Sequence, residues 1–303
     1  MIEFPAKGLQ LEVELTNHCN FNCKLCPQSH YQQDRTPGGN RFARPKGFMS
    51  DEVFSHVLRN AASYARGITL GFFGEQMMHP KLFQFLPALK DYGKLVVHSN
   101  WSLATVDIMS MMQSCVDVVQ ISIDASEASI WEELCPGGPV NDLGGRPTED
   151  RYGTLVDKIK YWLNRKHHPR TRLVYVVSST NEHDWPKFVR EWRPLLGPED
   201  DIMVKSAISY SGVVKDPYMT PHVCDVPDRF NMNIAWDGRC TPCNLDVDIG
   251  LYVGNIRGDL REIVESDHYE QVIAAMRERD SGVCKNCFDA NHRSDTRFFR
   301  RQS

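Results

Sequence analysis

Three cysteines near the N-terminus have the types and spacing of metal ligands. They are Cys19, Cys23 and Cys26, with three residues between the first two and two residues between the last two. Three thiolates are one ligand short of a tetrahedral structural zinc site. They can bind three irons of a cubane 4Fe–4S cluster, because such clusters are ligated by thiolates. The fourth iron then stays open to a substrate or cofactor.

A second group of cysteines lies near the C-terminus: Cys224, Cys240, Cys243, Cys284 and Cys287. The last four form two pairs, each separated by two residues. Two such pairs are the ordinary spacing of a structural zinc site. An iron–sulfur cluster would use the same ligand type, so the spacing alone leaves both possibilities open.

Strands and helices alternate along the first 215 residues and must position these groups. The strand-like segments are 9–15, 67–73, 94–100, 116–124, 171–178 and 201–208. Strands that alternate with helices predict βαβ units and a parallel sheet. The cysteine loop follows the first strand, at the end where β/α barrels carry their chemistry. Six such units are too few for an eight-stranded barrel.

The pattern changes beyond about residue 215. Asp237-Gly238 separates two short strand-like runs, which is a strong hairpin signal. A helix is expected over residues 260–279. We therefore expect two domains, 1–215 and 216–303, in an α/β protein.

The cysteine motif, placed directly after a strand, resembles that of the radical S-adenosylmethionine (SAM) enzymes. The resemblance implies a partial (β/α)6 TIM-like barrel and an open iron that chelates the amino and carboxylate groups of SAM. An electron from the cluster then cleaves SAM to methionine and a 5′-deoxyadenosyl radical. That family usually has an aromatic residue before the third cysteine, where this chain has Leu25, so we consider Phe21 for the adenine contact.

Later strand ends carry the same resemblance. Gly74-Glu75 is similar to the family's GGEP motif, with Phe73 and Gln76 in place of Gly and Pro. The resemblance implies that Glu75 accepts hydrogen bonds from the SAM ammonium group. Four further residues match elements that line SAM: Ser99, Asn100, Ser122 and Asp124. Trp101 stands where Gly is common, and its ring could narrow the active site or pack at the rim.

The C-terminal segment resembles the family's SPASM extension, or its shorter twitch form, in which a hairpin and a helix carry an auxiliary 4Fe–4S cluster. By that resemblance the ligands are Cys224, Cys243, Cys284 and Cys287, and Cys240 is extra. The zinc alternative uses Cys240 with the last three. Five cysteines are too few for two auxiliary clusters, so one is predicted.

Composition narrows the class of protein. The chain has 303 residues, 41% hydrophobic and 24% charged, with a net charge of −4. These values are typical of a soluble globular protein and give no signal for strong nucleic-acid binding. Neither a membrane span nor a secretory signal is visible. Ten cysteines then indicate metal ligands rather than disulfides, so we expect a cytoplasmic protein without a membrane partner.

The architecture resembles that of the twitch-type dehydrogenases that act on 2-deoxy-scyllo-inosamine. This resemblance implies radical oxidation or rearrangement of a small polar metabolite, such as a sugar or cyclitol. It also implies flavodoxin or ferredoxin as the reductant. The alternative is modification of a peptide, although only eighteen residues precede Cys19. A third hypothesis is a non-catalytic iron–sulfur or zinc scaffold. Such a scaffold would have no use for Glu75 and Asn100, which match the family's SAM-binding motifs.

Catalytic side chains are harder to predict. Cys135 lies on a Gly/Pro-rich loop after the fourth strand, and its thiol is a candidate hydrogen-atom donor to a substrate radical; an inert packing role is the alternative. No general base stands out. His30, His98 and Tyr210 are candidates by position only.

Overall fold

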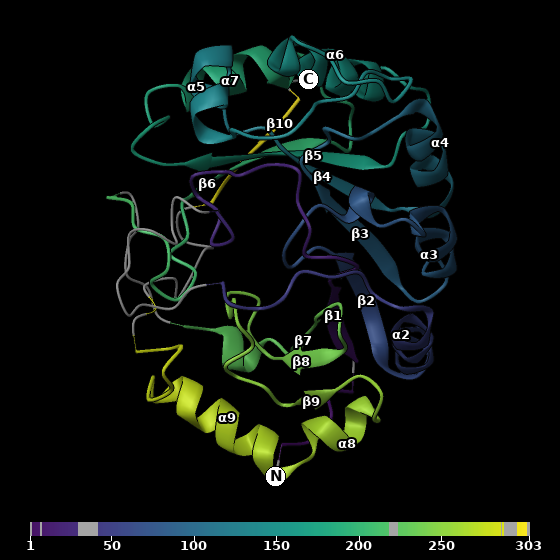
Figure 1. The fold of residues 1–303 in the computed structure, drawn as a ribbon, viewed down its shortest axis with the longest axis vertical. Helices are drawn as coiled ribbons and strands as arrows, with labels where there is room; N and C mark the ends of the chain where they lie inside the picture. Colours follow the sequence, from purple (N-terminus) through teal and green to yellow (C-terminus); the bar gives the residue numbers. More distant parts are fainter. Residues whose placement is uncertain are drawn as a thin grey trace.

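A curved ten-stranded sheet forms the centre of the molecule (Figure 1). The computed structural model describes residues 2–6, 8–29, 42–217, 224–285, 287 and 296–301. Within them the strand order is β10-β6-β5-β4-β3-β2-β1-β7-β8-β9. His30 lies outside the described residues.

Six neighbouring strands of this sheet are parallel. They are β1 (Leu9–Val13), β2 (Ala65–Leu70), β3 (Lys94–Ser99), β4 (Val118–Ser122), β5 (Arg170–Val177) and β6 (Asp201–Ser206). The predicted partial (β/α)6 barrel is confirmed. The barrel is open, because β7 (Asn231–Ile234) extends it beside β1 and β10 (Arg297–Arg300) pairs antiparallel with β6.

Helices cover the convex face of the sheet (Figure 1). They are α2 (Asp51–Tyr64), α3 (Leu82–Ala88), α4 (Val106–Cys115), α5 (Ala128–Leu134), α6 (Arg151–Leu163) and α7 (Trp185–Trp192). The strands direct alternate side chains toward them, so Leu9, Leu11 and Val13 of β1 are fully buried. The intervening residues, such as Glu12, face the concave side.

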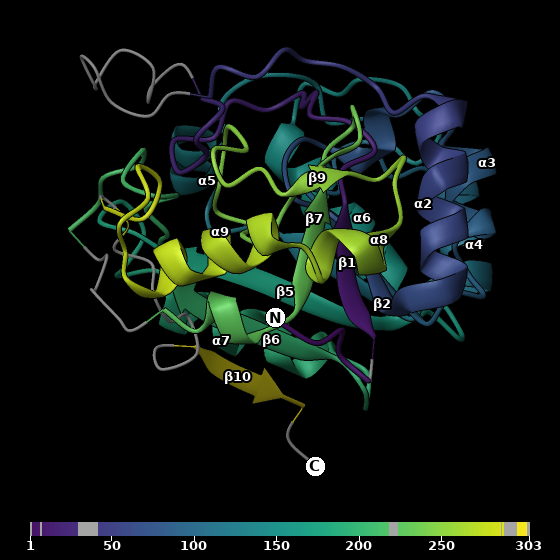
Figure 2. The same cartoon turned by 90° about the horizontal axis from the view of Figure 1, so that it is seen from below.

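The C-terminal part continues the same sheet. The predicted Asp237-Gly238 turn joins β7 to β8 (Arg239–Thr241), and β9 (Gly254–Asn255) completes the edge. The single helix expected over 260–279 is instead two, α8 (Leu260–Val264) and α9 (Asp267–Arg277), which run beneath these strands (Figure 2). The Ser266 side chain accepts a hydrogen bond from the Tyr269 backbone and starts the second helix there.

A buried ion pair joins the loop before α2 to the barrel. Both terminal nitrogens of Arg44 donate to the two carboxylate oxygens of Glu14, each at 2.8 Å. Its Nε donates to the Val247 carbonyl at 2.7 Å. Both side chains are shielded from water, so each charge depends on the other. Arg44 thus connects the end of β1 to the C-terminal part.

Arg44→Met should lower the free energy of unfolding by about 3–5 kcal/mol, because Glu14 would keep a buried charge without its partner. Chemical denaturation of the reconstituted protein measures this loss. Arg261→Met removes an exposed pair with Glu265 and should cost less than about 1 kcal/mol. Equal losses in the two variants would contradict the role assigned to Arg44.

Candidate functional site

The first cysteine loop is held by a backbone ladder to the segment that follows α5. The Lys24 amide donates to the Leu134 carbonyl at 2.8 Å, and the Asn22 amide donates to Pro136 at 2.8 Å. The Gly138 amide in turn donates to the Asn20 carbonyl at 2.6 Å. The loop therefore takes its shape from a segment more than a hundred residues further along the chain.

The thiols of Cys19, Cys23 and Cys26 face one another closely enough to influence one another's ionisation. Burial, followed by the charges of neighbouring thiols, raises the pKa of Cys19, and the same causes raise the pKa of Cys26 to about 12. Three thiols that resist ionisation together need a cationic partner to become thiolates. An iron–sulfur cluster, which binds thiolates, fits this set of donors.

Cys135 lies beside this group rather than on an open loop. It ends α5, a helix that the sequence pattern did not predict, and its side chain is buried. A hydrogen bond to the Cys135 thiol is the largest cause that raises the pKa of Cys23, followed by burial. Cys135 therefore lies next to the cysteine loop. That its thiol donates a hydrogen atom to a substrate radical stays a prediction.

Gly74 lets the end of β2 pack directly on the residues before Cys19. Its φ is +79°, and a Cβ there would lie 2.4 Å from the Thr16 carbonyl oxygen and 2.7 Å from that of His18. The Glu75 amide donates to this same His18 carbonyl at 2.7 Å. Only glycine tolerates such an approach, so the Gly-Glu pair fixes β2 against the cysteine loop.

Glu75 is a buried carboxylate that joins the ends of β2 and β3. It accepts from the Ser99 hydroxyl at 3.0 Å, the Asn100 amide at 2.7 Å and the Met77 amide at 3.1 Å. Burial raises its pKa, while these donors oppose the shift. A carboxylate has about four acceptor positions, so three donors leave about one for a ligand.

Asn100 links Glu75 to the cysteine loop. Its side-chain nitrogen donates to the Asn20 side chain at 3.1 Å and lies 3.9 Å from the Cys19 sulfur. The structure thus brings together four of the predicted residues, which come from three strand ends: Cys19, Glu75, Ser99 and Asn100.

Three other predicted residues lie around this centre. Ser122 is exposed at the end of β4, and Asp124 accepts from the Val176 amide at 2.8 Å. Phe21 is buried against Trp131, with ring centroids 5.5 Å apart. Trp101 is fully buried and packs on Trp162, so its ring does not narrow the site. Its φ of +61° explains why Gly is common at this position.

Gln76 was not among the predicted site residues, yet it joins two strand ends. Its Oε1 accepts from the Leu15 amide at 2.7 Å, and its Nε2 donates to the Phe73 carbonyl at 2.8 Å. The fully buried amide therefore joins the end of β1 to the turn after β2. Its place after Gly74-Glu75, where the family pattern has Pro, was the available signal.

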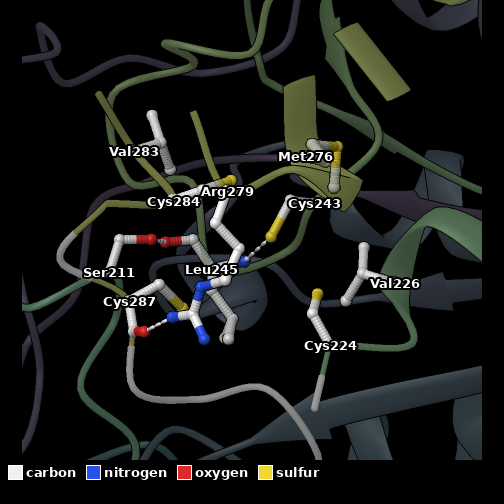
Figure 3. A pocket seen from close by; sticks show the side chains of 10 residues that line it. All are labelled: Ser211, Cys224, Val226, Cys243, Leu245, Met276, Arg279, Val283, Cys284 and Cys287. Carbon is white, nitrogen blue, oxygen red and sulfur yellow. Dashed lines mark hydrogen bonds between the residues drawn. The ribbon is translucent and has the colours of Figure 1, made fainter. Parts of the chain in front are cut away.

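Four of the five cysteines of the second group line a pocket between α9 and the segment after β6 (Figure 3). Its lining residues are Ser211, Cys224, Val226, Cys243, Leu245, Met276, Arg279, Val283, Cys284 and Cys287. The Leu245 amide donates to the Cys243 sulfur at 3.4 Å. Proteins adjust the reduction potential of iron–sulfur clusters through backbone hydrogen bonds to the sulfurs and through apolar surroundings.

Cys240 is separate from this pocket. It lies on β8, paired with Gly254, and its thiol donates to the Gly238 carbonyl at 3.6 Å. Burial raises its pKa. Within the described part of the chain, no three Cys, His, Asp or Glu side chains converge on a point that would hold a single metal ion. A cubane cluster does not require such convergence, because each thiolate binds a different iron.

The two other candidate bases have different surroundings. His98 is exposed on the concave face of the sheet. Tyr210 packs near Phe73, with ring centroids 6.0 Å apart.

Among the helices of the described residues, none is long and apolar enough to cross a membrane.

Comparison with known proteins agrees with these features. Residues 224–288 match SPASM, an iron–sulfur cluster-binding domain. A cofactor-modifying protein of the tungsten-containing aldehyde ferredoxin oxidoreductase, from Pyrococcus furiosus, is 24% identical over 272 residues, covering 77% of this chain and 70% of that protein.

Two solved structures have a similar fold. BtrN in complex with AdoMet and 2-DOIA has a TM-score of 0.57 at 14% identity, covering 95% of this chain and 93% of that one. Streptococcus suis SuiB bound to precursor peptide SuiA has a TM-score of 0.66 at 14% identity, covering 95% and 72%. The chain therefore has the fold of the radical SAM enzymes and carries a SPASM domain, as its motifs predicted. The SPASM match supports an auxiliary iron–sulfur cluster rather than zinc.

If the four pocket cysteines hold a cluster, Cys243→Ala should lower the iron content of the anaerobically reconstituted protein from about eight to about four per chain. Cys240→Ala is the matched control and should keep about eight. Iron and zinc are measured together by elemental analysis. About four irons and one zinc in the unsubstituted protein would favour the zinc alternative.

Proposed function

We propose that this protein is a radical SAM enzyme that abstracts hydrogen from a small polar metabolite and so starts its oxidation or rearrangement. A cluster on Cys19, Cys23 and Cys26 would supply the electron that cleaves SAM to methionine and a 5′-deoxyadenosyl radical. The observation that carries the proposal is the contact series from Glu75 through Asn100 to Cys19. A non-catalytic iron–sulfur scaffold that does not bind SAM would have no need of this contact series.

The chain's own residues have separate roles in this proposal. Glu75 keeps one acceptor position for the SAM ammonium group, a charge-assisted bond. Asn100 holds the cysteine loop at a fixed distance from Glu75. Exposed Ser122 faces the same concave side and is available to the cofactor or substrate. Cys224, Cys243, Cys284 and Cys287 would hold the auxiliary cluster. We also propose a division near residue 215 and flavodoxin or ferredoxin as the reductant.

Peptide modification is the second candidate. The observation that favours it is the TM-score of 0.66 to SuiB bound to its precursor peptide, against 0.57 to BtrN. The polar concave face of the barrel favours a small metabolite instead. A peptide substrate would have to lie across the open end of the barrel.

SAM cleavage separates an enzyme from a scaffold. The reconstituted protein, reduced under anaerobic conditions, should form 5′-deoxyadenosine, and Cys23→Ala should abolish this product. Cys240→Ala should leave it unchanged, because Cys240 lies apart from both groups. Absence of 5′-deoxyadenosine from protein with a full iron content would refute the proposal.

Glu75→Ala should weaken SAM binding by roughly 10- to 150-fold, because it removes a charge-assisted hydrogen bond worth about 1.5–3 kcal/mol. Calorimetric titration with SAM measures the affinity. Iron content should stay constant, since the hydrogen bonds that link Glu75 to the cysteine loop in the described part of the chain run through its backbone and Asn100. Exposed Glu149→Ala serves as the control. Undiminished affinity in Glu75→Ala would show that another residue binds the ammonium group.

A further inference from the structure

A lysine of the outer helical layer reaches into the interior near the end of β3. Lys158 belongs to α6, and its side chain is only 2% exposed, which is rare for an ammonium group. Its Nζ donates to the carbonyls of Ser102 and Asn141, each at 2.8 Å. A buried charge is costly even when it forms hydrogen bonds, so its position needs a reason.

The Ser102 contact leads back to the candidate cofactor site. The Ser102 amide and hydroxyl both donate to the Asn100 side-chain oxygen, at 2.9 Å and 2.6 Å. The hydroxyl also accepts from the Asn20 side chain at 2.9 Å. Asn100 is thereby held where its own amide donates to Glu75. Lys158 thus supports the turn that positions both Asn20 and Asn100.

The Asn141 contact brings in the loop between α5 and α6. The Asn141 amide donates to the Ser102 carbonyl at 2.9 Å, so it shares that oxygen with Lys158. The same loop includes Gly138, whose amide donates to the Asn20 carbonyl. One ammonium group therefore fastens two segments, the turn after β3 and this loop, and both of them contact the cysteine loop.

The charge of Lys158 also acts on Glu75. Burial lowers the pKa of Lys158 to about 7, and the carboxylates of Glu75 and Asp142 oppose this shift. The Lys158 charge in turn opposes the rise in pKa that burial causes in Glu75. Two further charged residues, Arg146 and Asp157, line a cavity beside Lys158. Opposite charges in a shielded interior favour each other's ionised form.

We propose that Lys158 is a positioning residue of the SAM site. Its ammonium group fixes the turn of residues 100–102 and supplies the countercharge for the Glu75 carboxylate. Lys158 acts through Ser102 and Glu75 rather than through contact with SAM. This inference rests on the proposed function, because it assigns a further residue to the same site.

Lys158→Met removes the ammonium group and keeps an unbranched side chain. Below neutral pH it should weaken SAM binding about ten-fold or more, because two hydrogen bonds from a charged donor are lost. Calorimetric titration of the anaerobically reconstituted protein measures the affinity. Iron content should stay constant, and the EPR spectrum of the reduced first cluster should not respond to SAM at a concentration that saturates the control. Lys160→Met, at an exposed position of the same helix, is the matched control.

The pH dependence separates a positioning charge from a packing defect. The affinity ratio of the unsubstituted protein to Lys158→Met should fall between about pH 6 and about pH 8.5, because the ammonium form is lost around its pKa of about 7. The titration of SAM itself cancels in this ratio. A ratio that stays constant, or an affinity equal to that of Lys160→Met, would overturn the inference.

Lys158→Gln gives the same test if Lys158→Met does not fold, because it keeps an amide donor without the charge. Its affinity ratio should fall over the same pH range, and a constant ratio would again overturn the inference. SAM cleavage is measured separately in the unsubstituted protein. If that protein forms 5′-deoxyadenosine while Lys158→Met behaves like the control, only this inference fails. If the unsubstituted protein binds SAM with the expected pH dependence but does not cleave it, only the proposed function fails.

Discussion

The close approach of β2 to the cysteine loop is the constraint on which the candidate site depends. At Gly74 the backbone lies so near the residues before Cys19 that no Cβ fits. This contact brings the Glu75 carboxylate into the interior, where it is the acceptor for two backbone amides and the Ser99 hydroxyl. Burial makes an unpaired carboxylate costly, so these donors both fix Glu75 and are fixed by it. The ends of β1, β2 and β3 thus become one unit.

Strong periodic signals allowed the barrel to be predicted. The alternation of apolar and polar residues over 9–15, and the apolar runs that follow it, depend only on which face of each segment is buried. Each segment therefore shows its own secondary structure in its sequence. The seven-residue helix α5 was missed because it is short and has no side-chain cap at its start. The ladder from the cysteine loop to residues 134–138 was missed for another reason. It is formed by backbone groups, which are the same in every residue.

The two cysteine pairs near the C-terminus show what strand geometry adds to spacing. Cys240 and Cys243 are equally good ligands by sequence. Cys240 belongs to β8, where pairing with β9 fixes the direction of its side chain. Cys243 follows the strand end, and its sulfur turns into the pocket with Cys224, Cys284 and Cys287. Family resemblance selected the same four, but spacing alone could not, since it carries no information on side-chain direction.

Sheet topology also explains why the sequence did not reveal that charged residues from distant strands share the concave face of the barrel. Glu12, His98 and Lys205 are single charged residues in strands separated by about a hundred residues each, and each alone is typical of a surface position. The parallel order from β1 to β6 turns all three toward one space. Lys205 precedes Ser211, which lines the second cysteine pocket, whereas Glu12 precedes the first cysteine loop. Strand order therefore brings two segments that lead to the two cysteine groups, far apart in the sequence, into one sheet. The order of strands in the sheet, more than any one motif, is what relates the two cysteine groups in space.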